Sequence, residues 1–423
     1  MSRIGALIES DAFGRILLAV FAIGIATSIS LAQSALALLA VRWLWRLGGR
    51  SRVARTWPLA APFLAWIGTS LLAALVSARP LESLLQAKDL LLIATFYVIL
   101  DGCREARDAD RVLGVLIAAI AAASVLGILQ VTLCGPGNVA TLLPTRLGRK
   151  CLGARGFYSI TMTFGGALSL VLLATLPRLL LPISRRRWWP IPLWLVSFLT
   201  LAITRVRGAW LGFLAGVLVQ SGLLRRRGAV LIGAIGVLAA ASLLVPLVRE
   251  RAATIADLNV NSTVDRLQMW TAGLAILLDH PIVGVGPGQV KRVFPGYSAP
   301  DAIRSHTGHV HSTPLQILIE RGVLGFVAWG WIVVGFLARS LRVLRELPPE
   351  AEPERALVTG SIGSVAGFLV GGLTEYNFGD SEVVMIAYCV MAMPFVVDAA
   401  FQRRRAEGGS EARRGGEVRS VSE

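Results

Sequence analysis

Apolar runs recur along the whole chain, and no other feature of the sequence constrains its fold as strongly. A helix that crosses a bilayer needs about 20 predominantly apolar residues. Charged residues make up 16% of this chain, against about 25% of a soluble protein. The sequence therefore predicts an all-α integral membrane protein with about twelve transmembrane helices. The runs lie near 15–29, 31–46, 58–77, 89–102, 112–134, 158–181, 190–204, 209–224, 228–248, 322–341, 357–374 and 382–400.

Arginine clusters stand at every second connection between these runs, and the alternation predicts how the protein is oriented. Cytoplasmic loops of membrane proteins carry an excess of arginine and lysine. Both termini are therefore expected in the cytoplasm, and the other connections on the outward face, which is the periplasm in a Gram-negative cell. Orientation also accounts for the net charge of +16, so we expect no nucleic-acid partner.

The spacing of the runs divides the chain into four parts. The connection 249–321 is far longer than usual, and long connections are often functional. The C-terminal tail is charged and rich in glycine and serine, which predicts disorder. The parts are nine membrane helices in 1–248, a periplasmic loop in 249–321, three membrane helices in 322–402 and a disordered cytoplasmic tail in 403–423.

The long loop is expected to contain amphipathic helices. Ser262 or Thr263 can cap a helix that carries Asp265 in its first turn. Apolar residues follow at helical spacing, and we expect the face that they form to pack against the membrane domain. That face consists of Val264, Leu267, Trp270, Leu274 and Leu277.

Several cations lie on the outward face, where the orientation rule disfavours them. Arginine binds phosphate through two parallel, charge-assisted hydrogen bonds, so a diphosphate at the membrane surface would explain two or three of these residues. Snorkelling to lipid headgroups is the alternative, above all for Arg205 and Arg155. The set comprises Arg205, Arg207, Arg266, Arg146, Arg149, Lys150 and Arg155.

Three histidines precede a predicted helix near residue 312, with Thr313 as its cap and Pro314 as its first residue. His311 then lies beside the positive end of the helix dipole, which favours a neutral imidazole that can accept a proton. His309 and His311 are two residues apart, without a cysteine or carboxylate at ligand spacing. We therefore predict no metal site.

Two of the four cysteines, Cys134 and Cys151, bracket the outward loop 135–157. A disulfide between them would form in an oxidising compartment and contribute about 3 kcal/mol. Two free thiols at the membrane edge are the equal alternative.

Two motifs resemble the O-antigen ligase and polymerase superfamily of bacterial membrane glycosyltransferases. The first is the arginine turn that opens a helix, Arg207-Gly208-Ala209-Trp210-Leu211-Gly212. The second is the long periplasmic region. It comprises Asp265-Arg266, Trp270, His280-Pro281-Ile282-Val283-Gly284-Val285-Gly286, His311-Ser312-Thr313-Pro314-Leu315-Gln316, Glu320-Arg321-Gly322 and Gly325. The motifs span about 120 residues, and the rest of the chain resembles the family only in topology.

The resemblance implies a GT-C-like enzyme of lipopolysaccharide biosynthesis in the bacterial inner membrane. An O-antigen ligase transfers the glycan of undecaprenyl diphosphate to the lipid A-core oligosaccharide at the periplasmic face, with inversion and without metal or other cofactor. Carried over by motif, His311 is the essential histidine, and Arg207 and Arg266 bind the diphosphate. His311 acts as general base or as hydrogen-bond donor to the leaving phosphate. Assisting cations would be Arg205, Arg155, Lys150, Arg149 and Arg146.

Three alternatives remain. O-antigen polymerase performs the same chemistry with a glycan as the acceptor. Protein O-oligosaccharyltransferases of the superfamily usually carry a larger soluble C-terminal part, which the short tail does not supply. From a different class comes an organic-anion transporter, but transporters tend to show repeated halves and ionisable residues near mid-membrane, and no repeat is visible here.

Overall fold

The computed structural model describes residues 10–48, 57–133, 153–181, 188–224, 226–254, 257 and 261–420, without the side chains of Arg226 and 408–420. Within these residues the chain forms helices joined by turns, and no strand occurs among them. The expected loop cations Arg146, Arg149 and Lys150 lie outside the described residues, as do Cys134 and Cys151.

The first half of the chain contributes the following helices in order: α2 (Asp11–Thr27), α3 (Ile29–Gly48), α4 (Ala60–Leu75), α5 (Pro80–Gln86), η1 (Ala87–Ile93), α6 (Ala94–Gly102), α7 (Ala106–Leu133), α9 (Thr161–Thr175), η4 (Leu176–Leu180) and α10 (Pro190–Ile203). The second half contributes α11 (Arg207–Leu224), α12 (Arg226–Ser242), α13 (Pro246–Ala253), α14 (Asn261–Asp279), α15 (Val290–Val293), η5 (Phe294–Gly296), α16 (Thr313–Glu346), α17 (Glu352–Gly371), η6 (Asn377–Gly379) and α18 (Ser381–Ser420).

Six helical segments in the described residues are long and apolar enough to cross a membrane, and up to seven if the 104° bend between α12 and α13 lies within one span. The expected count of twelve is thus not confirmed. Two of the expected spans, α4 and α10, have only 16 and 14 residues. At 1.5 Å per residue such helices reach about 24 and 21 Å, less than the roughly 30 Å hydrocarbon core.

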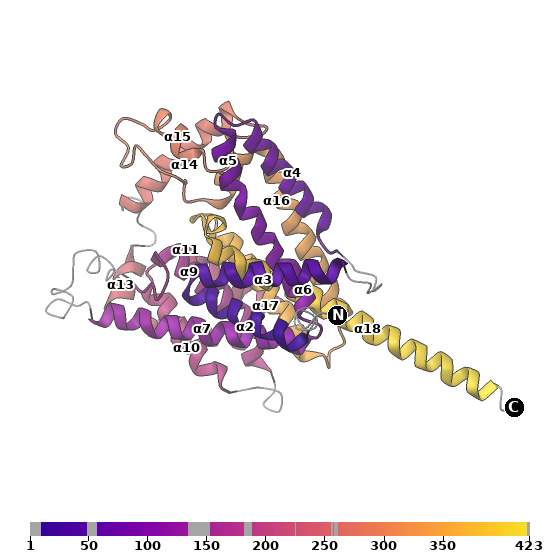
Figure 1. The fold of residues 1–423 in the computed structure, drawn as a ribbon. Coiled ribbons are helices and arrows are strands. Elements are labelled where there is room, and N and C mark those ends of the chain that lie inside the picture. The colour runs from indigo at the N-terminus through magenta and orange to yellow at the C-terminus, as the bar shows by residue number, and fades with distance from the viewer. Residues whose placement is uncertain are drawn as a thin grey trace.

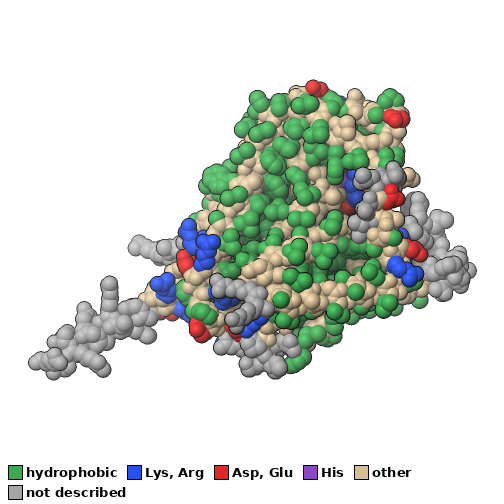
Figure 2. Space-filling model, turned by 180° about the vertical axis from the view of Figure 1, so that it is seen from behind, with side chains coloured by type: hydrophobic (Ala, Val, Ile, Leu, Met, Phe, Trp, Pro, Cys, Tyr) green, Lys and Arg blue, Asp and Glu red, His purple; other side chains and the backbone are tan. Residues whose placement is uncertain are grey.

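Hydrophobic side chains cover most of the face in Figure 2, and charged ones stand mainly toward its edges. Large apolar residues are correspondingly exposed on several helices, including Leu64, Leu91 and Val327 at 66%, 75% and 61%. A water-soluble protein rarely exposes apolar surface on this scale, so the surface is that of a helical integral membrane protein.

The buried centre is built from α9, α17 and α18, against which α11 packs closely. Glycines let the backbones of α11 and α17 approach each other, as small residues do in membrane helix pairs. A Cβ atom placed on Gly212 would lie 2.5 Å from the Gly367 carbonyl oxygen, and one on Gly367 would lie 2.6 Å from that of Gly212. This contact sets the position of Arg207 at the start of α11.

A second group of elements, α4, α5, α14, α15 and the first part of α16, lies above the stacked helices in Figure 1. A break at Gly322 (φ 61°, ψ −169°) interrupts α16. The glycine-rich turn after α14 fills this break, because Val285 N–H donates to the Ile319 carbonyl and Gly286 N–H to that of Glu320, both at 2.9 Å. Two of the motif segments, 280–286 and 320–322, are therefore packing partners of each other.

The buried face of α14 differs from the expected one. Leu267 and Leu274 are 47% and 53% exposed, so the prediction that they pack inward is wrong. The buried side holds Met269 and Ile276 together with small residues such as Gly273, which lets α16 approach. Helical periodicity identifies apolar stripes, but it does not decide which stripe meets the neighbouring helix.

The chain from 403 to 420 continues α18 as a helix where a disordered tail was expected. The six arginines and three glutamates of this segment are good helix formers and favour the extension, whereas its four glycines oppose it. Figure 1 shows this part of α18 projecting away from the other helices.

Candidate active site

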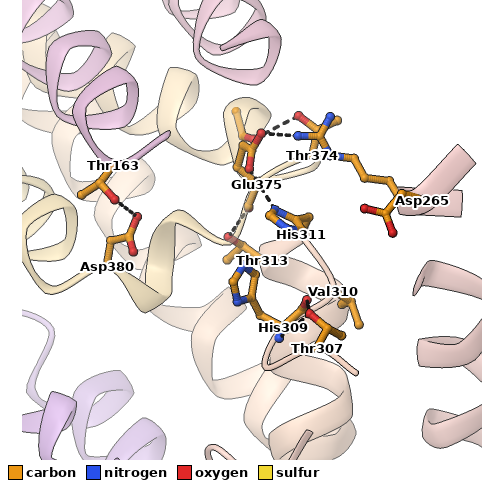
Figure 3. A network of polar contacts seen from close by, with 12 residues as sticks. Thr163, Asp265, Thr307, His309, Val310, His311, Thr313, Thr374, Glu375 and Asp380 are labelled. Atoms are coloured by element: carbon orange, nitrogen blue, oxygen red, sulfur yellow. Dashed lines mark hydrogen bonds and ion pairs between the residues drawn. The ribbon is translucent and has the colours of Figure 1, made fainter. Parts of the chain in front are cut away.

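The carboxylate of Glu375 lies between two of the predicted site residues. Its Oε2 is 3.2 Å from Nδ1 of His311, and its Oε1 accepts a charged hydrogen bond from Arg266. The Glu375 side chain is 4% exposed. Figure 3 shows Glu375 beside His311. Glu375 lies in the connection that joins α17 to α18. A carboxylate can only accept, so Nδ1 of His311 carries a proton, and Nε2 is the ring nitrogen that Glu375 does not engage.

The backbone around His311 is held in place from both sides. His311 has a left-handed conformation (φ 48°), which is unfavourable for a residue with a side chain. On one side Val310 N–H donates to Oε1 of Gln316 at 3.0 Å. On the other side Thr313 N–H donates to the Gly372 carbonyl at 2.7 Å. The helix starts at Thr313 with Ser312 as its cap, one residue earlier than expected.

Besides the contact of His311, Thr313 also bonds to Glu375, because its hydroxyl donates to the Glu375 backbone carbonyl at 3.0 Å. His309 packs edge to face on His311, with ring centroids 4.5 Å apart. Burial, followed by the charge of His311, lowers the pKa of His309 to about 4, so His309 is neutral at physiological pH. His311 is therefore surrounded by one charged acceptor and one neutral ring.

Arg207 is 8% exposed and is held by neutral oxygens. Its guanidinium donates to the Thr254 carbonyl at 2.7 Å, the Ser262 hydroxyl at 2.8 Å and the Thr263 hydroxyl at 3.3 Å. It therefore joins α11 to the end of α13 and the start of α14. None of these three acceptors is charged, so the positive charge of Arg207 is not neutralised by them.

A further arginine, Arg251 of α13, belongs to the same group. Its Nε donates to the Arg205 carbonyl at 3.2 Å, and Arg205, Arg207, Arg266 and Glu375 all act on it electrostatically. Arg266 pairs with Glu375, while Arg207 and Arg251 interact with this carboxylate only electrostatically. Such a cluster of arginines attracts a multiply charged anion.

The remaining predicted cation of the described residues, Arg155, is not bonded to this group. Its guanidinium donates to the Ser159 carbonyl at 2.6 Å. Arg205 contributes its backbone carbonyl to Arg251 and has a left-handed conformation (φ 61°). The structure thus brings Arg207, Arg266 and His311 together, whereas Arg155 makes no hydrogen bond to this group and bonds to Ser159 instead.

Sequence reasoning missed Glu375 and Arg251. Glu375 stands in a short connection between two apolar runs, and the orientation argument placed that connection on the outward face, which was the available signal. Arg251 lies among other charged residues after the run 228–248, and nothing in its spacing distinguishes it. Among the described residues, no three histidine, cysteine or acidic side chains come together as potential metal ligands.

Fold and site together define a multi-pass helical membrane protein with an arginine-rich centre beside a histidine–glutamate pair. Residues 192–330 match the family model Wzy_C, described as O-antigen ligase. That segment contains Arg207, Arg251, Arg266 and His311, and the match supports membership of the chain in the O-antigen ligase superfamily. No curated protein matches the chain. Members of the superfamily are membrane enzymes that act on lipid-linked glycans.

Proposed function

We propose that the protein is an O-antigen ligase that transfers a glycan from undecaprenyl diphosphate to the lipid A-core oligosaccharide, at the periplasmic face of the inner membrane. One observation carries the proposal: within and next to the family-matched segment, the imidazole of His311 contacts Glu375 through Nδ1 and lies beside arginines that can hold a diphosphate. The orientation argument supports placing this centre on the outward face.

The chemistry requires a base and a place for negative charge. The acceptor hydroxyl attacks the anomeric carbon of the donor sugar while its proton passes to Nε2 of His311. The bond between the anomeric carbon and the phosphate oxygen breaks, and its electron pair leaves with undecaprenyl diphosphate. Attack from the opposite side inverts the anomeric configuration. Cations near the phosphate stabilise the charge that develops there.

Arg207, Arg266 and Arg251 are the proposed diphosphate-binding residues. Arg207 is held in place by Thr254, Ser262 and Thr263, so little reorganisation is needed when an anion arrives. Arg205 and Arg155 are proposed to assist from the neighbouring turn, as are Lys150 and Arg146 of the loop outside the described residues. We also propose that Arg146, Arg149, Lys150 and Arg155 hold the anionic acceptor lipid.

Transfer by the purified protein, with an undecaprenyl-diphosphate-linked glycan as donor, tests these roles. His311→Ala is expected to reduce the transfer rate roughly 10²- to 10⁴-fold, because a positioned general base contributes about that much. Arg266→Ala should also lose most activity, since it removes charge beside the leaving phosphate. Matched controls are His306→Ala, next to Ser305 in the same loop, and Arg292→Ala, whose partner is Glu82. Transfer at the wild-type rate by either site variant would refute its assigned role.

The acceptor decides between ligase and polymerase. A ligase transfers the glycan to lipid A-core, whereas a polymerase extends another lipid-linked glycan. We expect the purified protein to glycosylate lipid A-core and to leave a second undecaprenyl-diphosphate-linked glycan unextended. Extension of the second glycan would identify a polymerase instead, and transfer to a protein would identify an oligosaccharyltransferase. Uptake of a labelled organic anion into proteoliposomes, without transfer, would favour a transporter.

A further inference from the structure

Glu375 has two partners with different roles in the proposed reaction. Its Oε1 accepts from Arg266, a proposed diphosphate ligand, and its Oε2 faces Nδ1 of His311, the proposed base, at 3.2 Å. The carboxylate is nearly inaccessible at 4%, whereas the Arg266 side chain is 16% exposed. Arg266 can therefore be reached by an incoming anion while Glu375 stays enclosed.

A diphosphate and Glu375 compete for the same guanidinium. Phosphate oxygens accept the paired N–H groups of arginine as carboxylates do, and with more negative charge. When Arg266 turns to the diphosphate, Glu375 loses the cation that neutralises it. His311 then remains as its hydrogen-bond partner, and an unneutralised carboxylate favours the protonated imidazole.

We propose that Glu375 couples donor binding to activation of the base: it is paired with Arg266 in the empty site and is released to His311 when the donor diphosphate takes Arg266. Glu375 is a positioning residue in this scheme, since it acts through His311 and touches no substrate. Its charge strengthens Nε2 as proton acceptor and stabilises the imidazolium formed when the acceptor hydroxyl is deprotonated. The proposal rests on the function proposed above, in which Arg266 binds the diphosphate.

Other charged or titratable groups surround His311, and they bond elsewhere. Arg304 of the preceding loop pairs with Asp265 at 2.8 Å. Asp380, before α18, accepts from the Thr163 hydroxyl at 2.9 Å, and His309 is neutral. Within the described residues, only Glu375 combines contact with His311 and contact with an arginine of the centre. Burial raises the pKa of Asp380 to about 6, so a pH experiment must control for Asp380.

The variant Glu375→Gln keeps the size of the side chain and an oxygen that accepts from His311, but it removes the charge. Two effects of opposite direction are expected. Farnesyl diphosphate, as a short donor analogue, should bind roughly 3- to 10-fold more tightly because Arg266 is no longer held. The kcat of glycan transfer should fall roughly 10- to 100-fold, because the base is weaker. A merely misfolded site would bind more weakly and react more slowly.

Glu382→Gln is the matched control, since Glu382 is a nearby carboxylate that makes no hydrogen bond to His311 or Arg266 among the described residues. It should change neither quantity. A pH profile adds a second readout. At low pH both kcat and kcat/KM for the donor should fall as the base becomes protonated, kcat in the donor-bound enzyme and kcat/KM in the free enzyme. In the wild type, kcat should fall at a higher pH than kcat/KM does. In Glu375→Gln, kcat and kcat/KM should fall at the same pH. In Asp380→Asn, the difference between the two pH values should remain.

Proton uptake separates failure of this coupling from failure of the proposed function. Calorimetry of farnesyl diphosphate binding in buffers of different ionisation enthalpy counts the protons taken up. The wild type should take up more protons than His311→Ala, and Glu375→Gln should lose this excess. Normal glycan transfer by a wild type that takes up no more protons than His311→Ala would overturn the coupling alone. Farnesyl diphosphate binding and the excess, without any glycan transfer, would overturn the proposed function alone. An unchanged kcat or weaker binding in Glu375→Gln would also overturn the coupling.

Discussion

Two residues with left-handed backbone conformations, Arg205 (φ 61°) and His311 (φ 48°), lie at this centre. Such conformations cost about 1–3 kcal/mol each in residues other than glycine, and they persist where the surrounding structure enforces them. Around His311 the enforcement comes from the bonds of Val310 to Gln316 and of Thr313 to Gly372. These backbone hydrogen bonds therefore hold His311 in its left-handed conformation.

Asp380 leads to a prediction on pH and stability. Burial raises the pKa of Asp380 to about 6 in the folded protein, above the value of about 3.9 expected in an unfolded chain. Between these values the folded state keeps a proton that the unfolded state releases, so the free energy of unfolding falls as the pH rises toward 6. Above that pH the folded protein carries the buried charge at its full cost.

Asp380→Asn cannot ionise and should escape this loss. We expect the variant to be more stable than the wild type above pH 6, by about 1–3 kcal/mol, and to lose this advantage in mildly acidic buffer. Thermal unfolding midpoints in detergent over that pH range provide the measurement. A stability difference between variant and wild type that does not change with pH would contradict the argument.

Residue types predicted part of the site. Arg207, Arg266 and His311 were proposed because cations expected on the outward face, and an imidazole at a helix start, need a chemical reason. Glu375 was not found, because an acidic residue in an outward connection violates no rule. Its role depends on contacts with Arg266 and His311, which lie 109 and 64 positions away in the chain.

At the scale of the helices, the contact between α11 and α17 positions Arg207. Both helices present glycines to each other, and a methyl group on either side would meet a backbone carbonyl. The backbone cannot give way as a flexible side chain can, so the helices would have to separate. Arg207 would then move relative to Glu375, which follows α17.

Gly212→Ala should therefore reduce both stability and transfer. We expect a loss of about 1–3 kcal/mol, as for other overpacked sites, measured as a lower thermal midpoint. Gly222→Ala lies in the same helix and is the control, because a Cβ atom there would meet no other atom within 4 Å. Equal behaviour of the two variants would show that the close approach of α11 to α17 has no energetic importance.

For the molecule as a whole, apolar runs and charge distribution were sufficient to predict an all-helical membrane protein. They did not fix the number of spans, because α4 and α10 are shorter than their apolar runs and α12 and α13 meet at 104°. They also did not reveal that the segments 280–286 and 320–322 pack on each other, since this contact consists of backbone hydrogen bonds. Breaks and bends depend on neighbouring helices, which periodicity does not describe.

In the proposed function, this centre joins a lipid-linked glycan to lipid A-core. The most direct measurement is the lipopolysaccharide profile of a deletion strain, complemented with either the wild-type gene or His311→Ala expressed at equal level. We predict that the deletion strain accumulates glycan polymer of normal length that is not attached to lipid A-core, and that only the wild-type gene restores attachment. A single glycan repeat on lipid A-core, an unchanged profile, or full restoration by His311→Ala would contradict the account.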